Sequence, residues 1–143
     1  MWVNIPNYRN WQEFYSHEVD GNNRAILETD ASGDVYLNNI VGGSYSCGAY
    51  YNPMPLNQWT LLTATYVSST NTISFYVNGA LKQATACGSD YSWNAMGTSV
   101  KNYIASQNGD YLNGKIDDSR IYNVALTATQ IAQLYQYGVT YQN

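Results

Sequence analysis

Two adjacent carboxylates, Asp117 and Asp118, stand in the stretch GKIDDSRIYN, which otherwise has the composition of a strand. A catalytic acid–base pair needs both carboxylates to face one bond, and a metal site needs them to face one ion. Successive side chains of a strand point to opposite faces, so in a strand from Lys115 to Tyr122 these two cannot act together. We therefore expect Asp118 to pair with Arg120 on its own face, and Asp117 to accept backbone N–H groups from a loop.

The single histidine, His17, gives no support for nucleophilic catalysis. No serine of the chain lies in a G-x-S-x-G motif, which would present a nucleophile on a sharp turn. A lone histidine among polar residues is more often a surface residue than a general base. A serine hydrolase is therefore not expected.

The two cysteines, Cys47 and Cys87, lack the spacing of a zinc or redox motif, which would use C-x-x-C pairs or nearby histidines. They are either a disulfide or two free thiols. In an oxidising compartment, a bridge that closes a loop of this length would stabilise the fold by about 4 kcal/mol in the chain-entropy model. We expect the bridge.

Two stretches that combine aromatic and amide side chains, SYSCGAYYN and SDYSWNAMG, could bind a sugar. Sugars present apolar ring faces that stack on aromatic rings, and hydroxyls that hydrogen bond to planar polar groups. We expect both stretches to be loops, and a Cys47–Cys87 bridge would tie them into one aromatic rim. The alternative is that tyrosines in a chain with 15 of them serve packing or ordinary surface. The candidate ligand-binding residues are Tyr45, Tyr50, Tyr51, Tyr91, Trp93 and Asn94.

Composition excludes several classes of partner. Only 11 % of the 143 residues are charged, the net charge is −4, and the six Lys and Arg residues are scattered. No basic stripe is available for nucleic acid, and no run approaches the roughly 18 apolar residues of a membrane span. Solubility that rests on Tyr, Ser, Thr and Asn is common in extracellular domains, so we expect an extracellular or cell-surface protein without membrane contact by this segment.

Short segments rich in β-branched and aromatic residues, separated by Gly, Asn, Asp and Ser turns, predict an antiparallel all-β protein. The Asn78-Gly79 pair suits a type I′ turn and predicts a hairpin. The length fits one domain. Met1, Val3 and Ile5 alternate with other residues as in the middle of a strand, which suggests a piece of a longer protein. The nine predicted strands are 1–5, 12–19, 24–29, 34–41, 59–67, 72–77, 81–86, 102–106 and 115–122.

One helix is predicted near the end of the chain, over residues 128–137. Thr127 and Gln130 have the spacing of a capping box, which satisfies backbone N–H groups at a helix start. Gly138 is expected to end the helix in the left-handed conformation. An apolar stripe that includes Ile131 would lie against a sheet.

The stretches NQWTLLTATYVSSTNTISFYVNGALK and YLNGKIDDSRIYNVALTATQIAQLY resemble the concanavalin-A-like lectin/glucanase superfamily, in its laminin-G-like branch of bacterial surface proteins. The resemblance covers residues 57–137 well and residues 1–56 in pattern only. It implies a two-sheet antiparallel jelly-roll sandwich with one short C-terminal helix. It also implies a single domain over residues 1–143 that lacks its first strand or strands.

The resemblance implies a non-catalytic extracellular module that binds a carbohydrate or another cell-surface ligand. The partner would be a polysaccharide or glycan, or neighbouring surface-protein subunits. The alternative is a structural or adhesive head domain of a pilin-like filament subunit. The family pattern around Ile116-Asp117 also makes Asp117 a candidate ligand of a structural calcium ion, although Ca²⁺ takes 6 to 8 oxygens and one carboxylate supplies at most two.

Some members of the superfamily are glycoside hydrolases with an E-x-D-x-x-E strand, which holds two carboxylates about 5 to 5.5 Å apart in a retaining site. The nearest match here begins at Glu28 and Asp30 but ends in Gly33, so the third carboxylate is missing. Glu13 and Glu18 differ in strand parity and would face opposite sides. We therefore predict that the chain is not an enzyme, and a glycoside hydrolase is the less favoured alternative.

Overall fold

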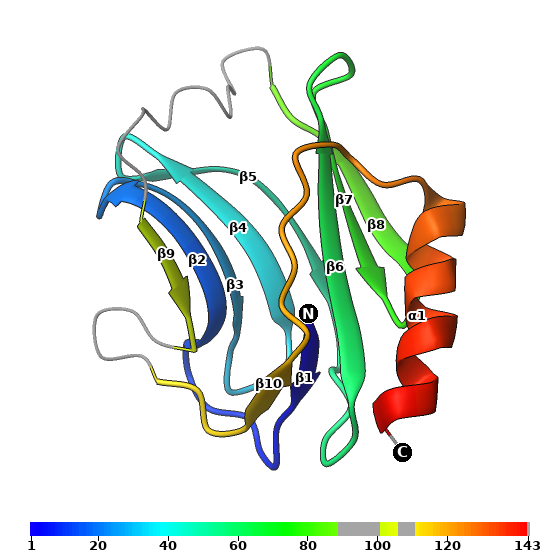
Figure 1. Cartoon of the computed structure of the whole chain (residues 1–143). Coiled ribbons are helices and arrows are strands. Elements are labelled where there is room, and N and C mark those ends of the chain that lie inside the picture. The colour runs from blue at the N-terminus through cyan, green and yellow to red at the C-terminus, as the bar shows by residue number, and fades with distance from the viewer. Residues whose placement is uncertain (89–100, 106–110, 143) are drawn as a thin grey trace.

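The structure is a computed structural model that describes residues 1–88, 101–105 and 111–142. Ten described strands form two antiparallel five-stranded sheets that face each other, and one helix lies outside them (Figure 1). The predicted all-β sandwich with a C-terminal helix is confirmed. No helix in the described ranges is long and apolar enough to cross a membrane.

The first sheet has the strand order β10-β1-β6-β7-β8, and the helix α1 lies against its outer side (Figure 1). Asn78 and Gly79 both have positive φ values, 52° and 79°, and join β7 to β8 in the predicted two-residue hairpin. The bounds are β1 Trp2–Asn4, β6 Thr60–Val67, β7 Thr72–Val77, β8 Ala80–Ala86, β10 Lys115–Asp117 and α1 Ala128–Gln142.

The second sheet has the order β5-β4-β3-β2-β9. Its strands bend, and the concave side lies away from the first sheet (Figure 1). The expectation that the stretch SYSCGAYYN is a loop is wrong, because its residues form the strand β5. This strand pairs with β4 over its full length, and such long-range pairing outweighs local preference. The bounds are β2 Gln12–Asp20, β3 Asn23–Thr29, β4 Val35–Val41, β5 Ser44–Tyr51 and β9 Lys101–Ile104.

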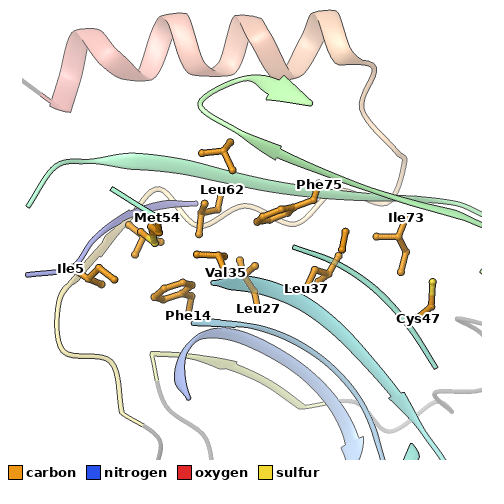
Figure 2. Packing of buried hydrophobic residues seen from close by; sticks show 13 residues of the cluster. Ile5, Phe14, Leu27, Val35, Leu37, Cys47, Met54, Leu62, Ile73 and Phe75 are labelled. Atoms are coloured by element: carbon orange, nitrogen blue, oxygen red, sulfur yellow. The ribbon is translucent and has the colours of Figure 1, made fainter. Parts of the chain in front are cut away.

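The core fills the space between the two sheets. Figure 2 shows Phe14, Leu27 and Val35 of the second sheet pointing toward Leu62 and Phe75 of the first. Each of these side chains is nearly or fully buried. Burial of a side chain of this size contributes about 1.5 to 3 kcal/mol, so this layer is the main source of stability.

A disulfide adds a covalent link between the sheets. Cys47 lies on β5 and Cys87 directly follows β8, and their Cα atoms are 5.6 Å apart. The bridge spans 40 residues of sequence, for which the chain-entropy model gives about 4 kcal/mol.

The helix begins where the sequence predicts and ends later. The Thr127 backbone N–H donates to Gln130 Oε1 at 2.8 Å, and the Gln130 N–H donates to Thr127 Oγ1 at 3.3 Å, so the capping box is present. Gly138 does not end the helix, which continues to Gln142. The reason for the glycine is packing: a Cβ atom at Gly138 would lie 2.4 Å from the ring of Trp2.

The strand predicted for residues 115–122 is shorter than expected. It ends at Asp117, because its neighbour β1 begins at Trp2, the partner of Asp117. Asp118 then adopts a left-handed conformation with φ 48°, which Asp tolerates better than most residues. The parity argument for the two carboxylates was therefore wrong in its premise, since Asp118 is not in a strand.

Candidate ligand-binding face

Backbone register determines which side chains reach the outer side of the second sheet. Val35 and Leu37 of β4 point into the core, so the alternate residues Tyr36 and Asn38 point outward. Their β5 partners, Tyr50 and Gly48, share that side. We call the outward residues on these two strands the concave face; it consists of Tyr36, Asn38, Tyr45, Gly48 and Tyr50.

Two tyrosines form an aromatic pair on the concave face. Tyr36 and Tyr50 are directly opposite each other in the ladder, and their ring centroids are 6.2 Å apart with an interplanar angle of 36°. Tyr50 is 54 % exposed, so this pair offers ring surface to solvent. Such a surface can stack on an apolar ligand face.

A loop of acidic residues fixes the Tyr36 ring. The Tyr36 hydroxyl is 3.1 Å from Asp34 Oδ2 and 3.2 Å from Asp30 Oδ2, and it donates to this carboxylate pair. Burial of the phenol and its hydrogen bond to Asp34 raise the pKa of Tyr36 to about 12. Tyr36 is therefore a neutral, oriented ring at physiological pH.

The same loop holds Asp30 in its ionised form. Partial burial opposes ionisation, but hydrogen bonds from Ser32, from the Asp34 backbone N–H and from Tyr36 lower the pKa of Asp30 below its usual value. The Asp30 carboxylate thus serves as the acceptor that keeps the loop and the Tyr36 ring in place.

Gly48 leaves a floor between two polar groups. A Cβ atom at Gly48 would lie 2.3 Å from the Leu37 carbonyl oxygen, so the close approach of β4 and β5 requires the glycine. The same position is 2.9 Å from the Tyr45 hydroxyl and 3.3 Å from Asn38 Oδ1, so both side-chain oxygens lie beside Gly48. Tyr45 is 66 % exposed. The Tyr45 hydroxyl and the Asn38 amide oxygen could hydrogen bond to the hydroxyls at the edge of a sugar ring. The adjacent aromatic pair could stack on the apolar C–H groups of the ring face.

Buried carboxylates lie next to this floor. Asn38 Nδ2 donates to Glu28 Oε1 at 3.1 Å, which fixes the amide orientation. Glu28 is directly opposite Glu13 in the β2–β3 ladder, and both are largely buried. Local sequence patterns do not reveal this pair, because it depends on the β2–β3 register and on the bulge beside Glu13.

The predicted aromatic residues are divided by the structure. Tyr45 and Tyr50 lie on the concave face, but on a strand and not on a loop. Tyr51 points to the opposite side of the sheet and packs against the core. The ammonium group of the exposed Lys82 lies 5.0 Å from the Tyr51 ring centroid. Tyr91, Trp93 and Asn94 lie outside the described residues.

Comparison with protein families shows the superfamily to which the chain belongs. A laminin-G-type model of the concanavalin A-like lectin/glucanases superfamily matches residues 1–132. The chain belongs to this superfamily. The resemblance seen in the sequence is confirmed, and the match extends over the amino-terminal part.

Solved structures of this superfamily's architecture share the fold at low identity. The Ruminococcus gnavus IT-sialidase CBM40 matches with a TM-score of 0.78 and 12 % identity, over 94 % of this chain and 79 % of that one. The heptameric SAP-like pentraxin of Limulus polyphemus matches with 0.63 and 16 %, over 94 % and 66 %. The receptor-binding domain of botulinum neurotoxin type G matches with 0.61 and 15 %, over 96 % and 36 %. No curated protein sequence matches the chain.

In this superfamily member, Asp117 and Asp118 lie at the β10 edge of the first sheet, whereas the concave face belongs to the second sheet. Arg120 Nε donates to Asp118 Oδ1 at 2.6 Å, as predicted. Asp117 Oδ1 accepts the backbone N–H of Asp118 at 2.7 Å, which also agrees with the prediction. Both carboxylates therefore have structural roles.

Calcium at Asp117 stays a prediction. The described residues contain no group of three or more His, Cys, Asp or Glu side chains that could hold a metal ion. Since Asp118 is paired with Arg120 and Asp117 caps a backbone N–H, the acidic side chains at this point do not make up the 6 to 8 oxygens that Ca²⁺ takes. The described geometry alone does not fit the ion.

Proposed function

We propose that the chain is a non-catalytic extracellular module that binds a glycan on its concave face. The observation that carries the proposal is the pair of the half-buried Tyr36 and the exposed Tyr50, beside the Tyr45 hydroxyl and the Asn38 amide. This arrangement provides stacking surface and fixed polar groups in one place, as specific small-ligand sites do. The Cys47–Cys87 disulfide supports an oxidising, extracellular location.

Fold likeness alone does not choose the ligand, because one jelly roll hosts many functions. One protein of similar fold is named as the CBM40 of a sialidase, but at 12 % identity this likeness shows the fold alone. The class of ligand is therefore proposed from the side chains of the concave face.

A glycan array probed with the intact chain tests the proposal, followed by calorimetric titration of the strongest glycan. We expect Tyr50→Ala to weaken binding by at least about tenfold, equivalent to about 1.4 kcal/mol. Tyr36→Phe keeps the ring and loses only the hydroxyl contacts with Asp30 and Asp34, so we expect a smaller loss. Tyr141→Ala is the matched control, since Tyr141 is 84 % exposed at the end of α1.

Two outcomes count against the proposal. Binding that survives both Tyr50→Ala and Tyr45→Ala would place the ligand elsewhere. An array with no glycan bound at millimolar concentration would remove the glycan as the ligand class and favour neighbouring surface-protein subunits as partners.

A further inference from the structure

The strand register arranges the outward side chains of the second sheet in rows that cross its strands (Figure 1). Residues that are directly opposite each other in a ladder share one side of the sheet, and neighbouring strands are about 4.8 Å apart. One row consists, from β2 to β5, of residues that are opposite each other in successive ladders: Glu13, Glu28, Tyr36 and Tyr50. The aromatic pair of the concave face is therefore continued on β3 and β2 by two carboxyl side chains.

These carboxyl groups bring negative charge to one end of the concave face. Glu13 and Glu28 are largely buried, and directly opposite side chains have Cβ atoms about 4.5 to 5.5 Å apart. Two carboxylates at that spacing repel each other, which favours a state in which the pair shares one proton and carries one negative charge. The loop between β3 and β4 adds Asp30 and Asp34, whose carboxylates hold the Tyr36 hydroxyl. We call the region of these four carboxyl groups the acidic end.

The basic residues lie away from the acidic end. All six Lys and Arg residues of the chain are within the described ranges, and none of them is in the row of Glu13 or in the next row. Arg24 and Lys101 are the ladder partners of Glu18, at the other end of β2. Lys82 belongs to the other sheet and lies over Tyr51 on the core side of β5. The remaining three are Arg9, ahead of β2, and Lys115 and Arg120, at the β10 edge of the first sheet.

The polar groups beside the aromatic pair are mainly hydrogen-bond acceptors. The Asn38 amide donates through Nδ2 to Glu28 Oε1, and its Oδ1 lies beside Gly48. The Tyr45 hydroxyl oxygen lies beside the same glycine. Ser16 is in the row of Asn38 and points to the same side, and its fully buried hydroxyl has no hydrogen-bond partner among the described residues. A ligand group with several donors matches this set better than a group that only accepts.

We propose that the acidic end makes the concave face selective for glycans that carry a protonated amino group; this rests on the proposed glycan function and names its ligand class. An ammonium group has three donors and no acceptor, so it matches the oxygens of Asn38 and Tyr45. It is attracted to the face of an aromatic ring and to the carboxylates behind Asn38. A carboxylate or sulfate on the sugar would be repelled by the same charges, so acidic glycans are disfavoured.

The test compares hexamers of glucosamine, glucose and glucuronic acid with the same linkage, which differ mainly in charge. The intact chain is titrated calorimetrically at mildly acidic pH, where the amino groups of the first and the carboxylates of the third are ionised. We expect the glucosamine hexamer to bind about tenfold or more tightly than the glucose hexamer, and the glucuronic acid hexamer about tenfold or more weakly. Higher ionic strength should reduce both differences, because salt screens charges that are open to solvent.

Two variants with the same change in net charge show where the selectivity arises. The double variant Glu13→Gln/Glu28→Gln removes the charge of the pair and keeps an amide oxygen that can accept from Asn38 Nδ2. Both residues are replaced, because either carboxyl group would stay ionised once the other is gone. Glu18→Gln is the matched control, since it removes one charge at the other end of β2. We expect the double variant to bring the affinities for the glucosamine and glucose hexamers to within about twofold, and Glu18→Gln to leave their ratio unchanged.

A third variant keeps the test open if the double variant does not fold, which its melting curve shows. Asp34→Asn removes a carboxylate from the half-buried loop at the acidic end and leaves the buried pair intact. It should lower the ratio of the glucosamine and glucose affinities about threefold.

The outcomes separate the amino-group selectivity from the glycan function. A glucose hexamer that binds through Tyr50 as tightly as the glucosamine hexamer would overturn the selectivity and leave the glycan site standing. A ratio that the folded acidic-end variants do not change, or that Glu18→Gln lowers equally, would show attraction by net charge alone and would also overturn it. If no hexamer and no glycan of the array binds, the glycan function itself is wrong and the selectivity falls with it.

Discussion

Replacement of Gly138 by Ala tests how far tertiary packing overrides helix propensity. Gly138 lies inside α1, where Ala is more favourable than Gly by about 0.8 to 1 kcal/mol. The new Cβ atom would, however, lie 2.4 Å from the Trp2 ring, which is 3 % exposed and stacked on Tyr135 at 5.7 Å. A buried and stacked ring must shift to accept the new atom, and overpacking of this kind costs about 1 to 3 kcal/mol.

The helix gain offsets part of this cost, so we expect Gly138→Ala to lower the free energy of unfolding by up to about 2 kcal/mol. Urea denaturation followed by circular dichroism measures it, and a double-mutant cycle supplies the control. In a Trp2→Ala background the clash is gone, so the same Gly138→Ala change should stabilise by up to about 1 kcal/mol. If Gly138→Ala stabilises the wild type, Trp2 does not constrain this position and the packing argument is wrong.

Three further predictions concern the amino terminus, catalysis and calcium. The Met1 amino group has a pKa of about 6 in the fold and 8.0 as its reference value, so the unfolded chain binds more protons between these values. Stability should then fall by about 2 kcal/mol as pH drops from 8 to 6, and chemical acetylation of the amino terminus should remove this slope; denaturation curves that are equal across the window would contradict it. No hydrolysis of β-glucans is expected, and turnover abolished by Glu28→Gln or Glu13→Gln would show that the buried glutamates are catalytic. If Asp117 holds calcium, excess calcium should raise the melting temperature relative to chelator, and Asp117→Asn should remove this shift; melts that coincide would leave Asp117 only as the acceptor of the Asp118 N–H.

Local signals in the sequence predicted the elements that local chemistry determines. The Thr127 and Gln130 side chains start α1, and Asn78-Gly79 forms the β7–β8 turn, in each case within a few residues. The end of α1 could not be predicted, because Gly138 is required by the distant ring of Trp2. Contacts between segments far apart in the sequence leave no local pattern.

The same distinction explains the candidate site. The tyrosines of β5 were predicted to bind a ligand because aromatic rings can stack on sugars, and two of them lie on the concave face. Only the β4–β5 register separates Tyr50, which faces Tyr36, from Tyr51, which faces the core. The pairing of Glu28 with Glu13 likewise depends on a register that includes a bulge. Side-chain type could be read from the sequence, but the face on which each side chain lies could not.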